Sequence, residues 1–431
     1  MIGIKGSGMS ALACILHDSG YEVEGSDTTD TLFTEESLRA RNISMVPFHV
    51  GNIQPHHTVI AGNAFKDDHE EVQQAKKVAK RFYRYHEFLG DWLGKFTSIA
   101  ISGAHGKTST TGMMSTVFSD VYPTSFLIGD GTGKGVENAS HFVFEACEYR
   151  RHFHAYQPDY AVVTNIDFDH PDYFHSLEDV QQAFIDFAQG VKKALIVCGD
   201  NREAKKLSDT KHIPTHTYGL HQDNDVQARN IQVTNGHTTF ELWKNEKLVQ
   251  PIMIPLVGVH HIQNSLAVLT IAMLENLPLE IVQASFMAYK GVKRRFQVLQ
   301  HGDVVVVDDY AHHPTEIKAT IETARLAYPT KKVVAVFQPH TFTRTKQFLR
   351  EFGESLSLAD QAYLCPIFGS AREQSGELSI QDLQSIIPNA KLVEDVGIDG
   401  LREESNAVLL FMGAGDIQKY ERSFLATACH S

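Results

Sequence analysis

Short apolar runs alternate with longer stretches of helical periodicity along most of this chain. Two examples are TVIAGNAF at 58–65 and FTSIAI at 96–101. Continuous apolar runs of this length are typical of strands buried on both faces of a parallel sheet, with helices as the crossovers. The pattern therefore predicts an α/β protein.

One region departs from this pattern. Between about 225 and 256 apolar and polar residues alternate, and Asn235-Gly236 divides the segment in two. Alternation around an Asn-Gly pair is typical of a β-hairpin with one solvated face. We expect an antiparallel addition here, followed by a helix that begins near 258–264 (GVHHIQN).

The strand and helix series divides into three parts. At 431 residues the chain is too long for one core. The first series of strands ends near residue 95, and a basic stretch at 291–296 (GVKRRF) precedes the last series. We therefore expect a Rossmann-like N-terminal domain at 1–95, a central P-loop α/β domain with the antiparallel addition at 96–292, and a C-terminal Rossmann-like α/β domain at 293–431.

Composition narrows the class of protein. Hydrophobic residues at 42% and charged residues at 21% are ordinary for a globular protein, and the net charge of −13 argues against nucleic-acid binding. The five cysteines have no metal-ligand spacing and suit a reducing compartment: Cys14, Cys147, Cys198, Cys365 and Cys429. No apolar run approaches the length of a membrane span, so we expect a cytoplasmic protein without membrane contact.

The segment after the 96–101 strand has the residues of a phosphate-binding loop. It reads Gly103, Ala104, His105, Gly106, Lys107, Thr108, Ser109, and an expected helix follows at 110–118. A strand, a glycine turn and a helix start direct backbone N–H groups at a polyphosphate, which Lys107 can reach. The usual first glycine of the longer loop is Ile101 here, so only G-x-x-G-K-T is present. An ordinary glycine turn is the alternative.

Oxygen ligands for a cation follow two neighbouring strands. Glu145 ends the run HFVFE, and the carboxylates of Asp167 and Asp169 and the imidazole of His170 follow the strand that ends near residue 166. With the Thr108 hydroxyl, these side chains predict Mg²⁺ held between the protein and a triphosphate. A structural role for His170 is the alternative.

The N-terminus carries a G-x-G-x-x-A pattern in which Gly6 and Gly8 follow a short strand and Asp27 ends the next one. Glycines at this spacing let a pyrophosphate approach the backbone, and Asp27 is placed to meet a ribose or a base. The pattern leaves three alternatives open: NAD, another diphosphate such as a UDP-sugar, or a structural turn.

Polar residues also follow the strands of the last domain. Arg294 and Arg295 lie at its entrance, where arginine forks suit a γ-phosphate, although a solvated basic run is the usual reading. The strand ends predict one crevice edge formed by Asp308, Asp309, Tyr310, His312, His313, His340, Arg344, Arg372 and Asp416.

Taken together and in order, these strings resemble the Mur ligase family over essentially the whole chain. The strings that carry the resemblance are GIKGSGMS (3–10), GAHGKTSTTG (103–112), FEACEYRRHF (144–153), TNIDFDHPDYF (164–174), GVHHIQN (258–264), GVKRRF (291–296), DDYAHHPTE (308–316), QPHTFTRT (338–345) and GAGDI (413–417). The resemblance implies a domain for a UDP-sugar, a central ATPase domain and a domain that brings the amino acid. Within the family, the strings are most similar to members that join L-alanine to UDP-N-acetylmuramate with ATP and Mg²⁺ in peptidoglycan precursor synthesis, as a monomer or homodimer.

The resemblance also implies roles for individual residues. It places Lys107 on the ATP phosphates, Arg295 near the γ-phosphate, and Thr108, Glu145 and His170 around Mg²⁺. The remaining ATP contacts would be His260 and Asn264 near the adenine and Asp309 near the ribose. The UDP-sugar would meet Gly6, Ser7, Gly8, Met9, Ser10 and Asp27. Tyr310, His312 and Arg344 would form the alanine pocket, with His312 as a candidate base for the amine.

Two features of the sequence depart from the family pattern. Position 261 is His where many relatives have Asn, and Thr341 stands where an Arg often precedes the Thr-Arg pair. Three other functions stay open: a ligase of the same family that attaches a recycled tripeptide, a nucleotide-dependent regulator, and an NAD-dependent oxidoreductase.

Overall fold

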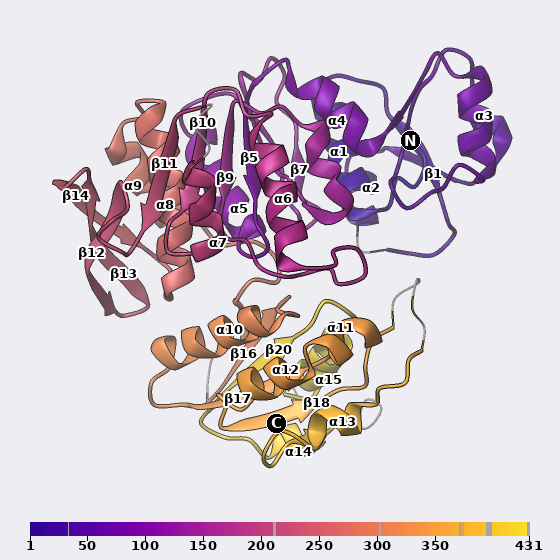
Figure 1. Ribbon diagram of the computed structural model, residues 1–431. Helices are drawn as coiled ribbons and strands as arrows, with labels where there is room; N and C mark the ends of the chain where they lie inside the picture. The colour runs from indigo at the N-terminus through magenta and orange to yellow at the C-terminus, as the bar shows by residue number, and fades with distance from the viewer. Residues whose placement is uncertain are drawn as a thin grey trace.

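The computed structural model describes residues 1–32, 34–209, 213–300, 303–369, 373, 375–393 and 399–428. Arg372 and Cys429 lie outside the described residues. The fold is mixed α/β, as the sequence predicts, and the ribbon shows three successive regions (Figure 1). The domain boundaries at 95/96 and 292/293 stay a prediction. No helix among the described residues is long and apolar enough to cross a membrane.

The N-terminal region is a small parallel sheet. Ile2 forms parallel bridges to Ser26 and Ala61 and so joins two strand pairs, β1–β2 and β3–β4. The elements are β1 Glu24–Asp27, β2 Ser44–Pro47, β3 Thr58–Ala61, β4 Arg81–Arg84, α1 Ser7–Asp18, α2 Glu35–Arg39, α3 Glu70–Val78 and α4 Tyr85–Leu93.

The central region is built on a ten-stranded sheet in the order β14-β13-β12-β11-β10-β9-β5-β8-β6-β7. Its strands are β5 Thr97–Ser102, β6 Thr124–Leu127, β7 Gly133–Lys134, β8 His141–Glu145, β9 Tyr160–Val163, β10 Ala194–Cys198, β11 Thr215–Gly219, β12 Val226–Thr234, β13 His237–Lys244 and β14 Lys247–Ile254. Its helices are α5 Lys107–Ser119, α6 Leu177–Ala188, α7 Arg202–Lys205, α8 Val259–Leu274 and α9 Leu279–Ala288.

The predicted antiparallel addition is confirmed. Strands β12, β13 and β14 pair antiparallel, and Asn235 and Gly236 both have positive φ, 53° and 75°. Two positive φ values in a two-residue turn match the right-handed twist of the flanking strands. The addition lies at the end of the sheet away from the N-terminal region (Figure 1).

The C-terminal region has its own six-stranded sheet in the order β15-β16-β20-β17-β18-β19, parallel except for β15. Its strands are β15 Gln297–Gln300, β16 Val304–Asp309, β17 Lys332–Phe337, β18 Gln361–Leu364, β19 Lys391–Leu392 and β20 Ala407–Met412. Its helices are α10 Pro314–Ala327, α11 Phe342–Gln347, α12 Leu349–Leu356, α13 Ile380–Gln384, α14 Asp399–Arg402 and α15 Gln418–Ala428. Helix α10 lies on the side that faces the central region (Figure 1).

The apolar cores do not correspond one to one with the three regions. One core combines side chains of α1 and α4 with strands β5, β8 and β9 of the central sheet. A second fills the other face of that sheet under α5, α8 and α9. The C-terminal sheet has separate cores on its two faces. The N-terminal and central regions therefore share a core, whereas the C-terminal region has its own.

Candidate functional site: a cavity between the central and C-terminal regions

The phosphate-binding loop connects β5 to α5. Gly103 has a φ of 134°, and a Cβ there would lie 2.1 Å from the Thr164 hydroxyl oxygen, so only glycine fits. The Thr164 hydroxyl also donates to the carbonyl oxygen of His105 at 2.6 Å. Helix α5 begins at Lys107, three residues before the predicted start, because the left-handed Gly106 ends the turn there. The first N–H groups of α5 have no partner within the helix, which suits an anion.

Lys107 is held at the base of this loop. Its ammonium group donates to the carbonyl oxygens of Gly103 at 2.5 Å and Ala104 at 3.1 Å, and it lies 3.1 Å from Glu148 Oε2. Burial lowers the pKa of Lys107, but Glu148 outweighs this and raises it above the ordinary value. The side chain is therefore a fixed positive charge beside the loop.

Thr108 and Glu145 meet at the start of α5. The Thr108 hydroxyl donates to Glu145 Oε2 at 2.9 Å, and the Gly129 backbone N–H donates to the same oxygen at 3.1 Å. A hydroxyl and a carboxylate next to a phosphate-binding loop are the hard oxygen donors that Mg²⁺ prefers. These two residues fit the predicted cation.

His170 lies in a different set of contacts. Its Nε2 is 3.7 Å from Glu148 Oε1 and 3.8 Å from Asp169 Oδ2. Burial lowers the pKa of His170 despite these carboxylates, so the ring is neutral. The structure thus groups His170 with Glu148, the partner of Lys107. A shared coordination sphere of His170 with Thr108 and Glu145 stays a prediction.

A cavity of about 320 Å³ lies beside the loop, between the central and C-terminal regions. Seven residues predicted to bind ATP line it: His105, Gly106, Ser109, His260, Asn264, Arg295 and Asp309. Several other polar residues that line it have no role predicted from the sequence: Thr164, Asn165, Asp200, Asn201, Gln263, Thr315 and Glu316. Asp167, predicted from its strand end as an oxygen ligand, also lines the cavity, and Asp200 follows the end of β10, a position that marks it in the same way.

Helix α8 closes one side of the cavity. Asn264, in the second turn of this helix, lies close to the loop. A Cβ atom added at Gly106 would lie only 3.1 Å from Asn264 Oδ1. Burial lowers the pKa of His260 to about 4, so this ring is neutral. His261 is buried, with its ring centroid 4.0 Å from that of His260.

The C-terminal region supplies Arg295 and Asp309. Asp309 accepts hydrogen bonds from the backbone N–H groups of Phe296 and Ala311, both at 2.8 Å. Burial raises its pKa to about 6, although the nearby Arg295 guanidinium opposes the shift. Arg295 lies over the Tyr310 ring at 5.3 Å and 3.5 Å from Glu316 Oε1. It also lines the cavity between the two regions.

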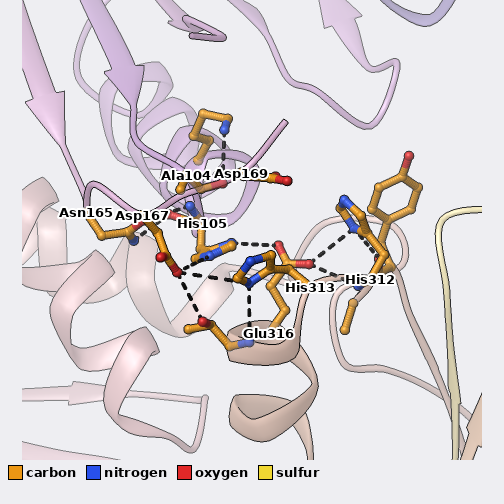
Figure 2. Close-up of polar contacts among 12 residues, drawn as sticks. Ala104, His105, Asn165, Asp167, Asp169, His312, His313 and Glu316 are labelled. Atoms are coloured by element: carbon orange, nitrogen blue, oxygen red, sulfur yellow. Dashed lines mark hydrogen bonds and ion pairs between the residues drawn. The ribbon is translucent and has the colours of Figure 1, made fainter. Parts of the chain in front are cut away.

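A set of polar contacts joins the loop to α10 (Figure 2). His105 Nε2 lies 3.1 Å from Asp167 Oδ2, and its Nδ1 lies 3.3 Å from Glu316 Oε1. Burial lowers the pKa of His105, but hydrogen bonds to these two carboxylates raise it to about 9. The Thr315 hydroxyl also donates to Asp167 at 3.1 Å. The grouping of His105, Asp167 and His313 is joined here by contacts of the two imidazole rings with one carboxylate, at 3.1 Å from His105 and 4.0 Å from His313.

The three residues predicted to bind the amino acid differ in their surroundings. The rings of Tyr310 and His312 lie 5.3 Å apart, and His312 faces the His340 ring at 6.4 Å. Arg344 is buried and donates from Nη2 to Asp169 Oδ1 at 2.8 Å. Its Nε has no hydrogen-bond partner among the described residues. One nitrogen of the guanidinium is therefore used within the protein, and a second is buried without a partner.

The N-terminal loop is held by its own contacts. Gly6 precedes α1, and Ser7 to Ser10 form the first turn of that helix, as the glycine pattern predicts. Asp27 is buried and accepts hydrogen bonds from the backbone N–H groups of Lys5 at 2.7 Å and Thr28 at 2.8 Å. These contacts shape the loop. Binding of a UDP-sugar by Gly6, Ser7, Gly8, Met9, Ser10 and Asp27 stays a prediction.

Three family models match the chain in succession. They are the Mur ligase family catalytic domain at residues 1–97, the Mur ligase middle domain at 101–272, and the Mur ligase glutamate ligase domain at 294–415. Together they span the N-terminal loop, the predicted phosphate-binding loop and the residues of the C-terminal crevice edge other than Asp416.

Solved structures of Mur ligases also match this chain over most of its length. A UDP-N-acetylmuramate–alanine ligase, MurC, from Thermotoga maritima matches with a TM-score of 0.83 and 26% identity, over 100% of this chain and 99% of that one. A murein peptide ligase from Psychrobacter arcticus matches with a TM-score of 0.71 and 21% identity, over 99% and 97%. A MurF ligase from Thermotoga maritima in complex with ADP has a TM-score of 0.67 and 19% identity, over 87% and 96%. The last two show the fold alone.

Proposed function

The chain belongs to the Mur ligase family, ATP-dependent ligases of peptidoglycan precursor synthesis, and on that premise we propose that it joins L-alanine to the lactyl carboxylate of UDP-N-acetylmuramate. The observation that carries the proposal is the match, over the full length of both chains, to a ligase described as acting on these two substrates. The residues Tyr310, His312 and Arg344 support it, because the rings of Tyr310 and His312 lie 5.3 Å apart and Arg344 carries the positive charge that a carboxylate requires.

The proposed reaction has two steps. The lactyl carboxylate attacks the γ-phosphorus of ATP, which gives an acyl phosphate and ADP. The alanine amine then attacks the acyl carbon, and phosphate leaves as the amide forms. Two anions must meet in the first step, so the fixed charges of Lys107 and Arg295 lower the repulsion between them.

Different residues of this chain have separate roles in the proposed reaction. Thr108 and Glu145 would hold Mg²⁺, which offsets charge on the phosphates when it is bound. Arg344 would pair with the alanine carboxylate through its guanidinium group, and His312 is the candidate to take the amine proton. Apposition of the C-terminal region excludes water from the acyl phosphate.

The deciding experiment is phosphate release from ATP and UDP-N-acetylmuramate, with amino acids added one at a time. L-Alanine should be the substrate. Glycine should be a poor substrate rather than an inert one, because one missing methyl group changes discrimination by only about 1–3 kcal/mol. Efficient turnover with a tripeptide and none with L-alanine would replace the proposal with the recycling ligase of the same family.

A further inference from the structure

Glu316, in the first turn of α10, contacts three residues with different predicted roles. One carboxylate oxygen, Oε1, lies 3.3 Å from His105 Nδ1 and 3.5 Å from Arg295 Nη1. The other, Oε2, accepts the backbone N–H of His312 at 3.1 Å and lies 3.2 Å from its Nδ1. His105 belongs to the phosphate-binding loop, Arg295 is predicted to meet the γ-phosphate, and His312 belongs to the predicted amino-acid pocket.

The contacts require a charged carboxylate. Only 10% of the Glu316 side chain is exposed, and burial alone would raise its pKa. His312, His105 and Arg295 outweigh burial and hold the pKa well below its usual range. Every group facing Glu316 in these contacts is a donor. A neutral amide would present its own NH₂ group to some of them and would leave a buried donor unpaired.

We propose that Glu316 is a positioning residue that holds Arg295 and His312 in register with the phosphate-binding loop, so that nucleotide and amino acid bind cooperatively. This inference rests on the proposed function of the site. Arg295 and His312 come from the C-terminal region and His105 comes from the central region, so one carboxylate fixes groups that separate folding units supply. Glu316 thus keeps Arg295 in position for a nucleotide bound at the loop. The same carboxylate keeps His312 in position for the amino acid.

The test compares Glu316→Gln with Glu322→Gln. Glu322 lies on the same helix, is 55% exposed and pairs only loosely with Lys318 at 3.9 Å, so it is a matched control. Calorimetric titration, with UDP-N-acetylmuramate and Mg²⁺ present throughout, gives the affinity for L-alanine with and without the non-hydrolysable analogue AMP-PNP. We expect AMP-PNP to tighten alanine binding by about tenfold in the wild-type protein, within the range usual for coupled sites. The factor should fall close to one in Glu316→Gln and stay unchanged in Glu322→Gln.

A retained coupling factor in Glu316→Gln would overturn the proposal. Glu316→Asp keeps the charge on a shorter arm, so it should recover part of the coupling; it also provides a measurement if the glutamine variant fails to fold.

A second titration separates this inference from the proposed function, because it uses AMP-PNP and Mg²⁺ without any amino acid. Glu316→Gln should weaken AMP-PNP binding by about tenfold through misplaced Arg295, and Glu322→Gln should not. If wild-type protein fails to bind L-alanine, the choice of amino acid is wrong, and the AMP-PNP result alone decides the role of Glu316. Equal AMP-PNP affinities in the two variants would overturn it.

Discussion

The central region meets its two neighbours in different ways. Its junction with the N-terminal region is apolar: Leu12 of α1 and Trp92 of α4 belong to the same core as Phe144 of β8. Its junction with the C-terminal region is largely polar, formed by His105, Asp167 and Glu316 and by the buried Arg344–Asp169 pair, with Phe168 and Phe348 as an aromatic contact.

The difference has a functional consequence. A continuous apolar core loses burial energy whenever its parts separate, so the N-terminal junction favours a single arrangement. Buried ion pairs recover hydration when their partners separate, which offsets much of the attraction that is lost. The predicted phosphate, nucleotide and amino-acid groups all lie at the polar junction, where ligand binding can compete with the contacts between regions.

The largest expected effect is on stability at the apolar junction. Leu12→Ala removes a fully buried side chain and should lower the free energy of unfolding by about 2–5 kcal/mol. Differential scanning calorimetry should show one transition for the N-terminal and central regions, shifted as a whole. Leu410→Ala, in the separate C-terminal core, is the control and should shift a different transition. Separate melting of the N-terminal region would contradict a shared core.

Lys107→Ala should affect both activity and stability. We expect ligase activity to fall by about 10²-fold or more, because a charge next to the phosphates is lost. The melting temperature should fall as well, because the buried Glu148 carboxylate loses its ion-pair partner. Near-normal turnover with an unchanged melting profile would remove Lys107 from the phosphate site.

Glu145→Gln should raise the Mg²⁺ concentration needed for half-maximal activity, by about 10-fold, since one of few protein ligands is weakened. His170→Ala is informative beside it, because the structure groups His170 with Glu148. Losses that do not multiply in the double variant would indicate one shared cation site. Multiplying losses, with Mg²⁺ dependence changed only by Glu145→Gln, would leave His170 outside that site.

Arg344→Lys should keep the positive charge but lose the fork. We expect KM for L-alanine to rise by about tenfold while KM for ATP and for UDP-N-acetylmuramate change little. Steady-state kinetics with each substrate varied in turn measures all three. A selective rise for ATP would assign Arg344 to the phosphate site instead.

The smallest expected effect is the pH dependence of the polar junction. The pKa of His105 is raised to about 9, so its contribution to stability is complete below the unfolded value near 6.5 and is lost as pH rises through 9. The difference in melting temperature between wild type and His105→Gln should therefore shrink between about pH 6 and pH 10. A constant difference over this range would show that His105 is not charged in the folded protein.

Much of the fold followed from local signals. Apolar runs marked β5, β8, β9 and the C-terminal strands β16, β17, β18 and β20, because burial on both faces of a sheet demands them, whereas the two-residue strand β19 has no such run. Asn235-Gly236 marked the hairpin, because few residues adopt two successive positive φ values. The helix start at Lys107 was predicted three residues late, since a glycine turn has no apolar period to mark it.

The sequence by itself determined the phosphate-binding loop, the strand ends that carry polar residues and the resemblance to the Mur ligase family. Only the tertiary structure brought His105 to Glu316, which is 211 residues away, and Arg344 to Asp169, which is 175 residues away. Hydrophobic periodicity records which face of an element is buried, and turn residues record local dihedral angles. Neither pattern indicates which distant carboxylate a buried basic side chain will contact, because that depends on how the regions pack against one another.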